Sequence, residues 1–328
     1  MKIAILGGGA VGLGLGATLH AAGCAPRIVV RNAATRAALQ ARGLHRFGFF
    51  DPVAIAPEQL ELLSDPAALA NDPPDIALVC TKTTANPELS RVLEDAFGGT
   101  PPPTKWVFCQ NGWGSERAFA GWLPEAQLFH ARVITGFRRA RENEIEITAH
   151  AQPIAVGSLF REPASALGSL CDRIAAGGLP CAFTRGIGAE LWGKMLYNCA
   201  LNPLGALLEV AYGELIQRPP SKALVESVVV EIFAVLAAAE FEAPWPDAGT
   251  YLEVFYRELL PPTERHRSSM LQDLAAGRRT EIDALCGEVV ALGEQVGVAT
   301  PVNAALVTLL RAREARGPSS AATRLSAP

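Results

Sequence analysis

The feature that most constrains the fold is a glycine-rich turn that directly follows the first apolar run of the chain. Residues 2–6 read KIAIL, a short stretch typical of a strand buried inside a parallel sheet. It meets Gly7, Gly9 and Gly12 in the spacing GxGxxG, and a run rich in Ala, Leu and Gly then continues as a helix to Gly23. A strand, a GxGxxG turn and a helix in this order predict a dinucleotide-binding unit.

Each part of this turn has a separate task in such folds. Gly7 permits the tight turn, Gly9 lets a pyrophosphate approach the backbone, and Gly12 allows the helix to pack against the strand. The N–H groups of the first helical turn, at Ala10 and Val11, then face the phosphates. We therefore predict an α/β fold that begins with a Rossmann-like dinucleotide-binding domain. The alternative is a glycine-rich turn that binds nothing.

The end of the second strand predicts which dinucleotide is bound. Residues 27–30 read RIVV, and Arg31 and Asn32 follow at the point where these folds place the residue that contacts the ribose. An acidic residue there would accept a hydrogen bond from the 2′-hydroxyl of NAD, whereas Arg31 can neutralise a 2′-phosphate. This favours NADP. The alternative is that Arg31 is a solvated charge at the start of a helix over 33–42.

Two later strands carry polar residues at their carboxyl ends, where open α/β sheets bind their ligands. The run at 75–80 (DIALVC) leads to Lys82, and the run at 105–109 (KWVFC) leads to the turn QNGWG, which contains Asn111. We expect both side chains to border the ligand. The Asn-Gly pair could instead have been selected for its backbone conformation alone.

A cationic segment stands out among the remaining strands of the first half. Residues 44–74 predict short strands and turns, and residues 127–158 alternate in a way that predicts an antiparallel edge of the first domain. Within the latter, Arg138, Arg139 and Arg141 follow one another closely. We interpret them as a solvated hairpin rather than as part of a binding site.

The length of the chain predicts two domains. At 328 residues it is long for one hydrophobic core. A helix at 164–176 and a strand near 181–184 close the first domain, which we assign to residues 1–185. Residues 186–316 are expected to be helical throughout, and residues 317–328, rich in Ser, Ala and Pro, are expected to be disordered.

The composition narrows the class of protein. The chain is 49% hydrophobic and 19% charged with a net charge of −4, which predicts a soluble globular protein and no nucleic-acid surface. The N-terminus shows no signal peptide and no run could span a membrane, so we expect a cytoplasmic protein. The seven Cys and five His lack metal-ligand spacing, which predicts reduced cysteines and no metal site.

A second chemical signal lies on a predicted helix over 189–208. Lys194, Asn198 and Asn202 are spaced i, i+4 and i+8 and therefore share one face, while the apolar residues recur at helical spacing. One amine and two carboxamides in a row suit hydrogen bonding to a small polar ligand. The alternative is a surface lysine beside two asparagines that hold helices together.

Several of these stretches resemble the ketopantoate reductases, which are NADPH-dependent 2-dehydropantoate 2-reductases. The matching segments are QNG at 110–112, WGKMLYN at 192–198 followed by NPLGAL at 202–207, SSMLQD at 268–273 and TEID at 280–283. The likeness extends over nearly the whole chain up to about residue 310. It implies a cofactor domain that delivers hydride and a helical domain that supplies the proton donor.

The resemblance assigns roles to the residues that match its motifs. It implies that Lys194 donates the proton and that Glu281 orients Lys194 or holds a substrate hydroxyl. Asn198, Asn202 and Ser269 would form hydrogen bonds to the substrate.

The resemblance also covers residues other than these. By the same resemblance, Asn111 would lie near the nicotinamide ribose and the reacting carbonyl, and Lys82 would border the cofactor. Ser268 and Asp273 match as well, but a helix cap and a brace explain them equally well. The substrate carboxylate needs a cation, and His266 with Arg267 is the nearest basic pair in the sequence.

The predicted function is the NADPH-dependent reduction of 2-dehydropantoate to pantoate, as in pantothenate biosynthesis. The cationic residues at 135–141 depart from the family, which often has His and Gly-rich residues there, so a reductase of another small 2-oxo acid is an alternative. A non-catalytic NADPH-binding sensor is a third, although it would not need Lys194 and Glu281 together. The apolar helices are compatible with a homodimer and equally with internal packing.

Overall fold

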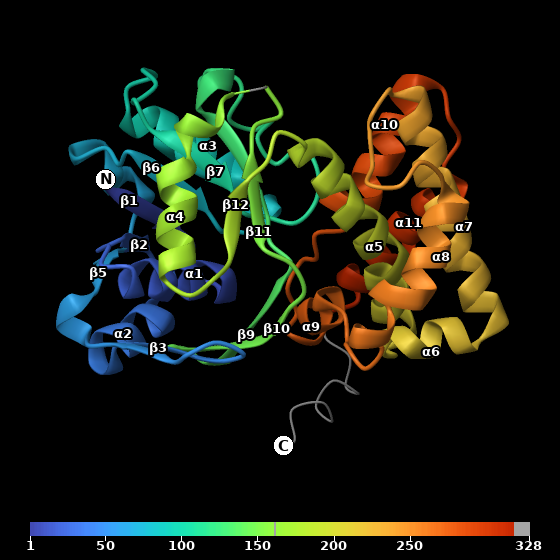
Figure 1. The fold of residues 1–328 in the computed structure, drawn as a ribbon, viewed down its shortest axis with the longest axis horizontal. Helices are drawn as coiled ribbons and strands as arrows, with labels where there is room; N and C mark the ends of the chain where they lie inside the picture. Colours follow the sequence, from blue (N-terminus) through green and yellow to red (C-terminus); the bar gives the residue numbers. More distant parts are fainter. Residues whose placement is uncertain (161, 318–328) are drawn as a thin grey trace. The chain divides into compact units, whose positions relative to one another are not determined.

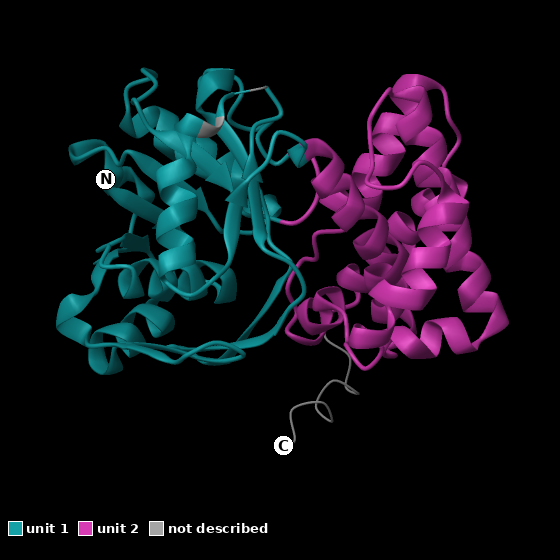
Figure 2. Ribbon diagram, viewed as in Figure 1, with its two compact units in different colours: residues 1–110, 115–187 teal, residues 111–114, 188–328 magenta. Residues whose placement is uncertain are grey.

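A computed structural model describes residues 1–160 and 162–317 of the chain (Figure 1). The chain divides into two compact units (Figure 2). Unit 1 contains residues 1–110 and 115–187, and unit 2 contains residues 111–114 together with the chain from 188 onward. The short excursion of residues 111–114 into unit 2 has no counterpart in the sequence analysis. The tail expected to be disordered lies, from residue 318 on, outside the described residues.

Unit 1 is built around a mainly parallel sheet, as the dinucleotide motif predicts. In spatial order its strands are β12 (Cys181–Phe183), β11 (Ile154–Gly157), β8 (Leu128–Arg132), β7 (Lys105–Phe108), β6 (Ile76–Val79), β1 (Ile3–Leu6), β2 (Arg27–Val29) and β5 (Glu61–Leu63). Strand β1 is central, with Ile5 in register with Ile28 and Leu78 on either side. The sheet runs parallel from β5 to β8, and β11 reverses the direction against β8.

Helices cover both faces of this sheet, because successive side chains of a strand point to opposite faces. Ile3 and Ile5 pack on one face in a core with residues of α1 (Ala10–Ala21) and α4 (Gly168–Ala176). Ala4 and Leu6 pack on the other face with residues of α3 (Asn86–Ala96). The remaining helical segments of unit 1 are α2 (Ala33–Arg42), η1 (Pro57–Gln59), η2 (Pro66–Asn71), η3 (Thr83–Ala85), η4 (Glu125–Gln127) and η5 (Ala164–Ala166).

Strands β8 and β11 pair antiparallel near one edge of the main sheet, as predicted for residues 127–158. The hairpin between them, which carries the arginines, lies outside this sheet, and this corrects that part of the prediction. Strands β9 (Thr135–Arg141) and β10 (Glu144–His150) form a separate sheet with β3 (Leu44–Gly48) and β4 (Val53–Ile55), in the order β4-β3-β10-β9. Strand β10 runs parallel to β3. The sheet packs on α1, where a Cβ atom at Gly14 would overlap the ring of Phe137. Glycine in this helix therefore makes room for the second sheet.

Unit 2 is helical throughout its described residues. Its elements are α5 (Ile187–Leu208, of which Ile187 itself belongs to unit 1), α6 (Tyr212–Gln217), α7 (Pro219–Ala238), α8 (Ala248–Val254), η6 (Phe255–Leu259), η7 (Pro261–Thr263), α9 (Ser269–Ala275), η8 (Asp283–Gly287), α10 (Glu288–Val296) and α11 (Pro301–Ala315). The apolar residues on which the helix over 189–208 was predicted, such as Trp192, Met195 and Leu196, are all buried. Helix α6 was not predicted.

Helix α5 continues through a proline. Pro203 has no N–H to donate to the carbonyl of Cys199, four residues earlier. The thiol of Cys286 in η8 donates to that carbonyl instead, with Sγ and O 3.8 Å apart. The break in the helical ladder thus receives a partner from another segment.

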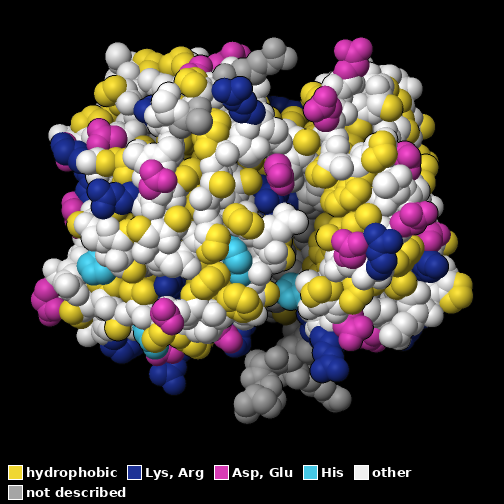
Figure 3. Space-filling model, viewed as in Figure 1, with side chains coloured by type: hydrophobic (Ala, Val, Ile, Leu, Met, Phe, Trp, Pro, Cys, Tyr) yellow, Lys and Arg dark blue, Asp and Glu magenta, His cyan; other side chains and the backbone are white. Residues whose placement is uncertain are grey.

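Two negative findings apply to the part of the chain that the structure describes. No helix there combines the length and the apolar character needed to cross a membrane. The same residues include no grouping of His, Cys, Asp and Glu that could ligate a metal ion. On the face drawn in Figure 3, basic and acidic side chains are interspersed with apolar ones.

Candidate active site

The glycine turn of unit 1 has the geometry that a bound pyrophosphate requires. Gly7 has φ +130°, and a Cβ atom there would lie 2.8 Å from the carbonyl carbon of Cys80. A Cβ atom at Gly12 would overlap the carbonyl oxygen of Gly7, so α1 can approach β1 only through glycine. A Cβ atom at Gly9, in contrast, would meet nothing within 4 Å. The tight positions are therefore structural, and the position expected to face the ligand borders open space.

The first turn of α1 is also suited to an anion. Gly9 is the N-cap residue in an extended conformation, and no acidic residue lies in the first turn. The N–H groups at Ala10 and Val11 are among those that an α-helix leaves without an intrahelical acceptor. Together with the space beside Gly9, these groups fit the phosphates of a dinucleotide.

Arg31 lies between β2 and the N-cap residue of α2, as predicted, but it has a partner that the sequence did not indicate. Its Nη1 is 3.5 Å from Oε1 of Glu88 in α3, and both side chains are half-exposed or more. Asn32 caps α2 by accepting a hydrogen bond from the N–H of Thr35 at 2.9 Å. Lys82 follows β6 and is the half-buried N-cap residue of η3.

The three hairpin arginines do not behave alike. Arg138 pairs with Glu146, and Arg141 pairs with Glu144 at 3.5 Å, so both fit the interpretation of a solvated hairpin. Arg139 does not fit it, because its guanidinium donates a hydrogen bond to the carbonyl oxygen of Gly8 in the glycine turn.

In unit 2, the QNG turn is joined to the TEID segment. The Nδ2 of Asn111 donates to Oε2 of Glu281 at 3.1 Å, and the N–H of Trp113 donates to the carbonyl of Ala284 at 3.1 Å. Gly112 between them has φ +96°, and a Cβ atom there would overlap that same carbonyl. Glycine is therefore needed for the backbone of this turn, as the alternative interpretation holds. Asn111 contacts a predicted catalytic residue, and its contact with the cofactor and the substrate stays a prediction.

The same two segments contact helix α5. The rings of Trp113 and Trp192 lie 4.9 Å apart between centroids, and Cys286 donates to the carbonyl of Cys199. Trp192 is two residues before Lys194, and Cys199 directly follows Asn198. The turn, the TEID segment and the lysine helix therefore belong to one packed cluster within unit 2.

The polar face of α5 is only partly open. Lys194 and Asn198 are half-buried, whereas Asn202 is 4% exposed and its Oδ1 accepts a hydrogen bond from the hydroxyl of Tyr212. Burial raises the pKa of Tyr212, so this hydroxyl keeps its proton and remains a donor. Asn202 thus joins α6 to α5 through its Oδ1, a contact that was not predicted, and its contact with the substrate stays a prediction.

The SSMLQD segment separates into structural and available residues. Ser268 is the N-cap residue of α9, and its Oγ accepts from the N–H of Leu271 at 3.0 Å. Asp273 is buried and accepts from Nε of Arg278 at 3.1 Å. The cap and the brace that were considered for these two residues are confirmed. Ser269 is exposed at the start of α9.

The predicted basic pair has other contacts. Nη1 of Arg267 donates to the carbonyl of Glu209 at 3.2 Å, and the ring of His266 lies 5.3 Å from that of Tyr212. Neither contact involves the Asn111–Glu281 pair.

Comparison with known proteins decides the family. Residues 3–160 match the model of ketopantoate reductase PanE/ApbA, and residues 187–314 match its C-terminal model. The chain is 30% identical over 318 residues to the 2-dehydropantoate 2-reductase of Vibrio cholerae serotype O1, covering 96% of this chain and 98% of that protein. It is 34% identical over 242 residues to that of Aquifex aeolicus, covering 74% of this chain and 77% of that protein. The chain belongs to the ketopantoate reductase family.

Solved structures share the fold of the family. The PanE/ApbA family ketopantoate reductase from Ralstonia eutropha JMP134 is 27% identical with a TM-score of 0.83, over 96% of this chain and 99% of that one. A D-mandelate dehydrogenase in complex with NADH and anilino(oxo)acetate is 24% identical, also with a TM-score of 0.83, over 96% and 99%. At that identity the second likeness concerns the fold alone.

One contact near the family's TEID motif was missed by the sequence analysis. Oε1 of Glu314 in α11 accepts from both the N–H and the Oγ1 of Thr280, at 2.7 and 2.6 Å. Thr280 is buried, and its Oγ1 in turn accepts from the N–H of Ile282 at 3.3 Å. The residues on both sides of Glu281 are thereby held in place. No local pattern could have indicated a partner 34 positions away.

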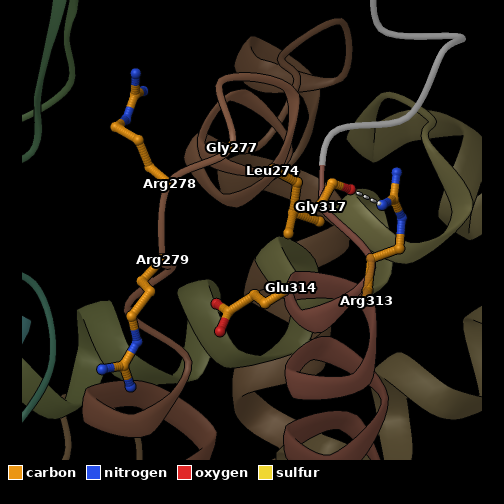
Figure 4. Close-up of a pocket in the computed structure, with 7 residues that line it drawn as sticks. All are labelled: Leu274, Gly277, Arg278, Arg279, Arg313, Glu314 and Gly317. Atoms are coloured by element: carbon orange, nitrogen blue, oxygen red, sulfur yellow. Dashed lines mark hydrogen bonds between the residues drawn. The ribbon is translucent and has the colours of Figure 1, made fainter.

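Glu314 also lines a small pocket that is distinct from the predicted substrate residues. The lining residues are Leu274, Gly277, Arg278, Arg279, Arg313, Glu314 and Gly317 (Figure 4). Its arginines have acidic partners: Arg278 pairs with Asp273, Arg279 with Asp283, and Arg313 with Glu209. Because these charges are compensated, we assign the pocket no part in substrate binding.

Proposed function

We propose that this member of the ketopantoate reductase family reduces 2-dehydropantoate to pantoate with NADPH. The observation that carries the proposal is the hydrogen bond between Asn111 and Glu281, in a cluster that also contains the lysine helix. A carboxylate, a carboxamide and an amine held by one packed unit are the groups that a small hydroxylated 2-oxo acid needs for recognition and protonation. The relatives named 2-dehydropantoate 2-reductase supply the substrate.

Unit 1 would hold the cofactor. The N–H groups at Ala10 and Val11, beside Gly9, would bind the pyrophosphate, and Arg31 would pair with the 2′-phosphate in place of Glu88. Lys82, after β6, would border the nicotinamide half. When bound, NADPH supplies a hydride to the carbonyl carbon of the substrate.

Unit 2 would supply the remaining chemistry. The ammonium group of Lys194 would donate a proton to the carbonyl oxygen as it gains charge. Glu281 would fix the amide of Asn111 through their hydrogen bond and so orient it toward the substrate. Asn198 and Ser269 would form further hydrogen bonds to the substrate, while Asn202 would support the helix from its buried position.

We also propose the wider context of the enzyme. Residues 1–185 would form the NADP-binding domain, with the turn at 111–114 contributed to the helical domain of residues 186–316. The protein would act in the cytoplasm, where 2-oxo acids and NADPH are available. Val230 on α7 and Leu309 on α11 are exposed apolar residues compatible with a homodimer, which light scattering would detect.

One assay tests the proposal and its alternatives. Oxidation of NADPH is followed by absorbance with a panel of small 2-oxo acids that includes 2-dehydropantoate. The proposal predicts the highest kcat/KM for 2-dehydropantoate. Faster turnover of another 2-oxo acid would support the same reaction with a different substrate. Binding of NADPH without turnover of any acid would support a non-catalytic NADPH-binding sensor.

A further inference from the structure

Arg139 is set apart from its neighbours by its burial and by the direction of its side chain. Its side chain is 31% exposed, against 61% for Arg138 and 74% for Arg141. Its Nη2 donates to the carbonyl oxygen of Gly8, inside the turn expected to receive the cofactor. A residue from the hairpin therefore reaches the dinucleotide motif.

The other end of the same guanidinium binds a carboxylate. Nη1 of Arg139 lies 3.0 Å from Oε2 of Glu142 and 3.2 Å from Oγ1 of Thr35. The hydroxyl of Thr35 also donates to that oxygen of Glu142. Thr35 is fully buried in the first turn of α2, so Glu142 marks a place where an anionic oxygen is held by a cation and a hydroxyl.

This place adjoins the end of the second strand. A Cβ atom at Gly8 would lie 2.8 Å from Cγ1 of Val30, and Val30 immediately precedes Arg31. The glycine turn, the end of β2 and the first turn of α2 therefore meet around Arg139. In dinucleotide folds this is where the 2′ position of the adenosine ribose is recognised.

We propose that Arg139 is a second cation for the 2′-phosphate of NADP and that Glu142 is its resident counter-ion, which the phosphate displaces. The inference rests on the proposed function, because it assumes that the cofactor is NADP. A phosphate carries more charge than a carboxylate and offers more acceptor oxygens to a guanidinium. Glu142 is 44% exposed in the turn between β9 and β10, so its carboxylate can move into solvent.

The proposal predicts opposite effects for the two partners. Loss of Arg139 removes a favourable contact that only a 2′-phosphate makes. Loss of the charge on Glu142 removes a competitor of that phosphate. If Arg139 serves only to hold the glycine turn, its loss should weaken the binding of nucleotides with and without the 2′-phosphate to the same extent. Removing the charge of Glu142 should then not tighten the binding of NADP⁺.

The test measures the binding of NADP⁺ and of NAD⁺ by calorimetry, without substrate and therefore without catalysis. The two nucleotides differ only in the 2′-phosphate. Arg139→Ala should weaken NADP⁺ binding about tenfold or more and change NAD⁺ binding by less than about twofold. Glu142→Gln should tighten NADP⁺ binding by about three- to tenfold and leave NAD⁺ unchanged. Arg138→Ala and Glu144→Gln are matched controls that make the same charge changes on the same hairpin, and they should have little effect.

Each outcome decides between the possibilities. Equal losses for the two nucleotides in Arg139→Ala, or no gain in Glu142→Gln, would overturn the inference while leaving the proposed function intact. If the unmodified protein binds NAD⁺ as tightly as NADP⁺, both the inference and the NADP assignment fail. Should Arg139→Ala not fold, Arg139→Gln keeps more of the aliphatic stem and a polar end without the charge, and it should still lose selectivity for NADP⁺.

Discussion

The carboxamide of Asn111 donates a hydrogen bond to the carboxylate of Glu281 over 3.1 Å, although the two residues are 170 positions apart in the chain. The first segment of unit 1 ends at Gln110. Asn111 is the next residue, yet it packs within unit 2. The chain thus delivers a residue from the end of a sheet strand to the helical unit. This makes the pair the most direct target for mutation.

Replacing both members of the pair should show that they act together. Asn111→Ala and Glu281→Ala should each lower kcat/KM for 2-dehydropantoate, because each removes the hydrogen bond between the two side chains. The double variant should lose less than the two separate losses combined, by about 1 kcal/mol or more in a double-mutant cycle. Fully additive losses would mean that the hydrogen bond has no part in catalysis.

Lys194→Ala should separate binding from chemistry. We expect kcat to fall by about two to four orders of magnitude, the usual share of a general acid, while the Kd for NADP⁺ stays nearly unchanged. Lys222→Ala is a suitable control, since Lys222 is a lysine on α7, outside the proposed site, that pairs with Glu226 at 3.8 Å. Wild-type kcat in Lys194→Ala would remove the residue from the mechanism.

Glu314 should act on catalysis through Thr280. Thr280→Val removes the hydroxyl that donates to Glu314 at 2.6 Å, and Glu281 should then lose its fixed position. We expect kcat to fall about tenfold or less with unchanged affinity for NADP⁺. Thr308→Val makes the same change at an exposed site of α11, where the hydroxyl bonds only within the helix, and should leave kcat as it is. A similar kcat for both variants would argue against a positioning role for Thr280.

Arg31 should carry part of the preference for NADPH. A charge-assisted contact with the 2′-phosphate contributes about 1.5–3 kcal/mol, or roughly a ten- to hundredfold preference in kcat/KM over NADH. Arg31→Ala should erase most of it, and rising salt should reduce it, since Arg31 is half-exposed. Equal use of NADH and NADPH by the unmodified protein would identify Arg31 as a solvated charge.

Stability of unit 1 should fall in acid because of a buried pair outside the proposed site. Nε2 of His130 lies 2.9 Å from Oε2 of Glu116, and both side chains are buried. Burial raises the pKa of Glu116, but the hydrogen bond and the charge of His130 outweigh it and leave the pKa below its ordinary value of 4.5.

The direction of the effect follows from linkage. Because the unfolded carboxyl takes up its proton at a higher pH than the folded one, this contribution is present above about pH 4.5 and is lost as pH falls through the folded pKa. Urea unfolding of the unmodified protein between pH 7 and pH 3 should therefore show a steeper loss of stability than Glu116→Gln. Parallel curves for the two proteins would show that the pair is not coupled to folding.

Local patterns predicted the elements that local chemistry determines. Helix α2 begins and ends where expected, because Asn32 caps it and Gly43 follows it. The GxGxxG turn and the buried face of α5 likewise follow from spacing within a few residues. In these segments the sequence neighbours are also the structural neighbours.

Predictions that depend on distant contacts were less successful. The alternation of residues 127–158 indicated strands, but not that β10 would pair with β3, about a hundred residues earlier. Helical spacing placed Asn202 in line with Lys194, but it did not indicate that Tyr212 of α6 would bond to Asn202. The solvated hairpin was a sound interpretation for Arg138 and Arg141 and wrong for Arg139, because the glycine turn that it contacts lies 131 positions away.

The proline in α5 links the integrity of that helix to the TEID segment. With alanine at position 203, the helix could satisfy the carbonyl of Cys199 by itself, and the thiol of Cys286 would have to share that acceptor with a backbone N–H. A substitution that makes the isolated helix more regular would then loosen the segment that carries Glu281. The hydrogen bond that Pro203 cannot make within α5 is replaced by one from the TEID side of the unit. The helix that carries Lys194 and the segment that carries Glu281 are thereby joined to each other.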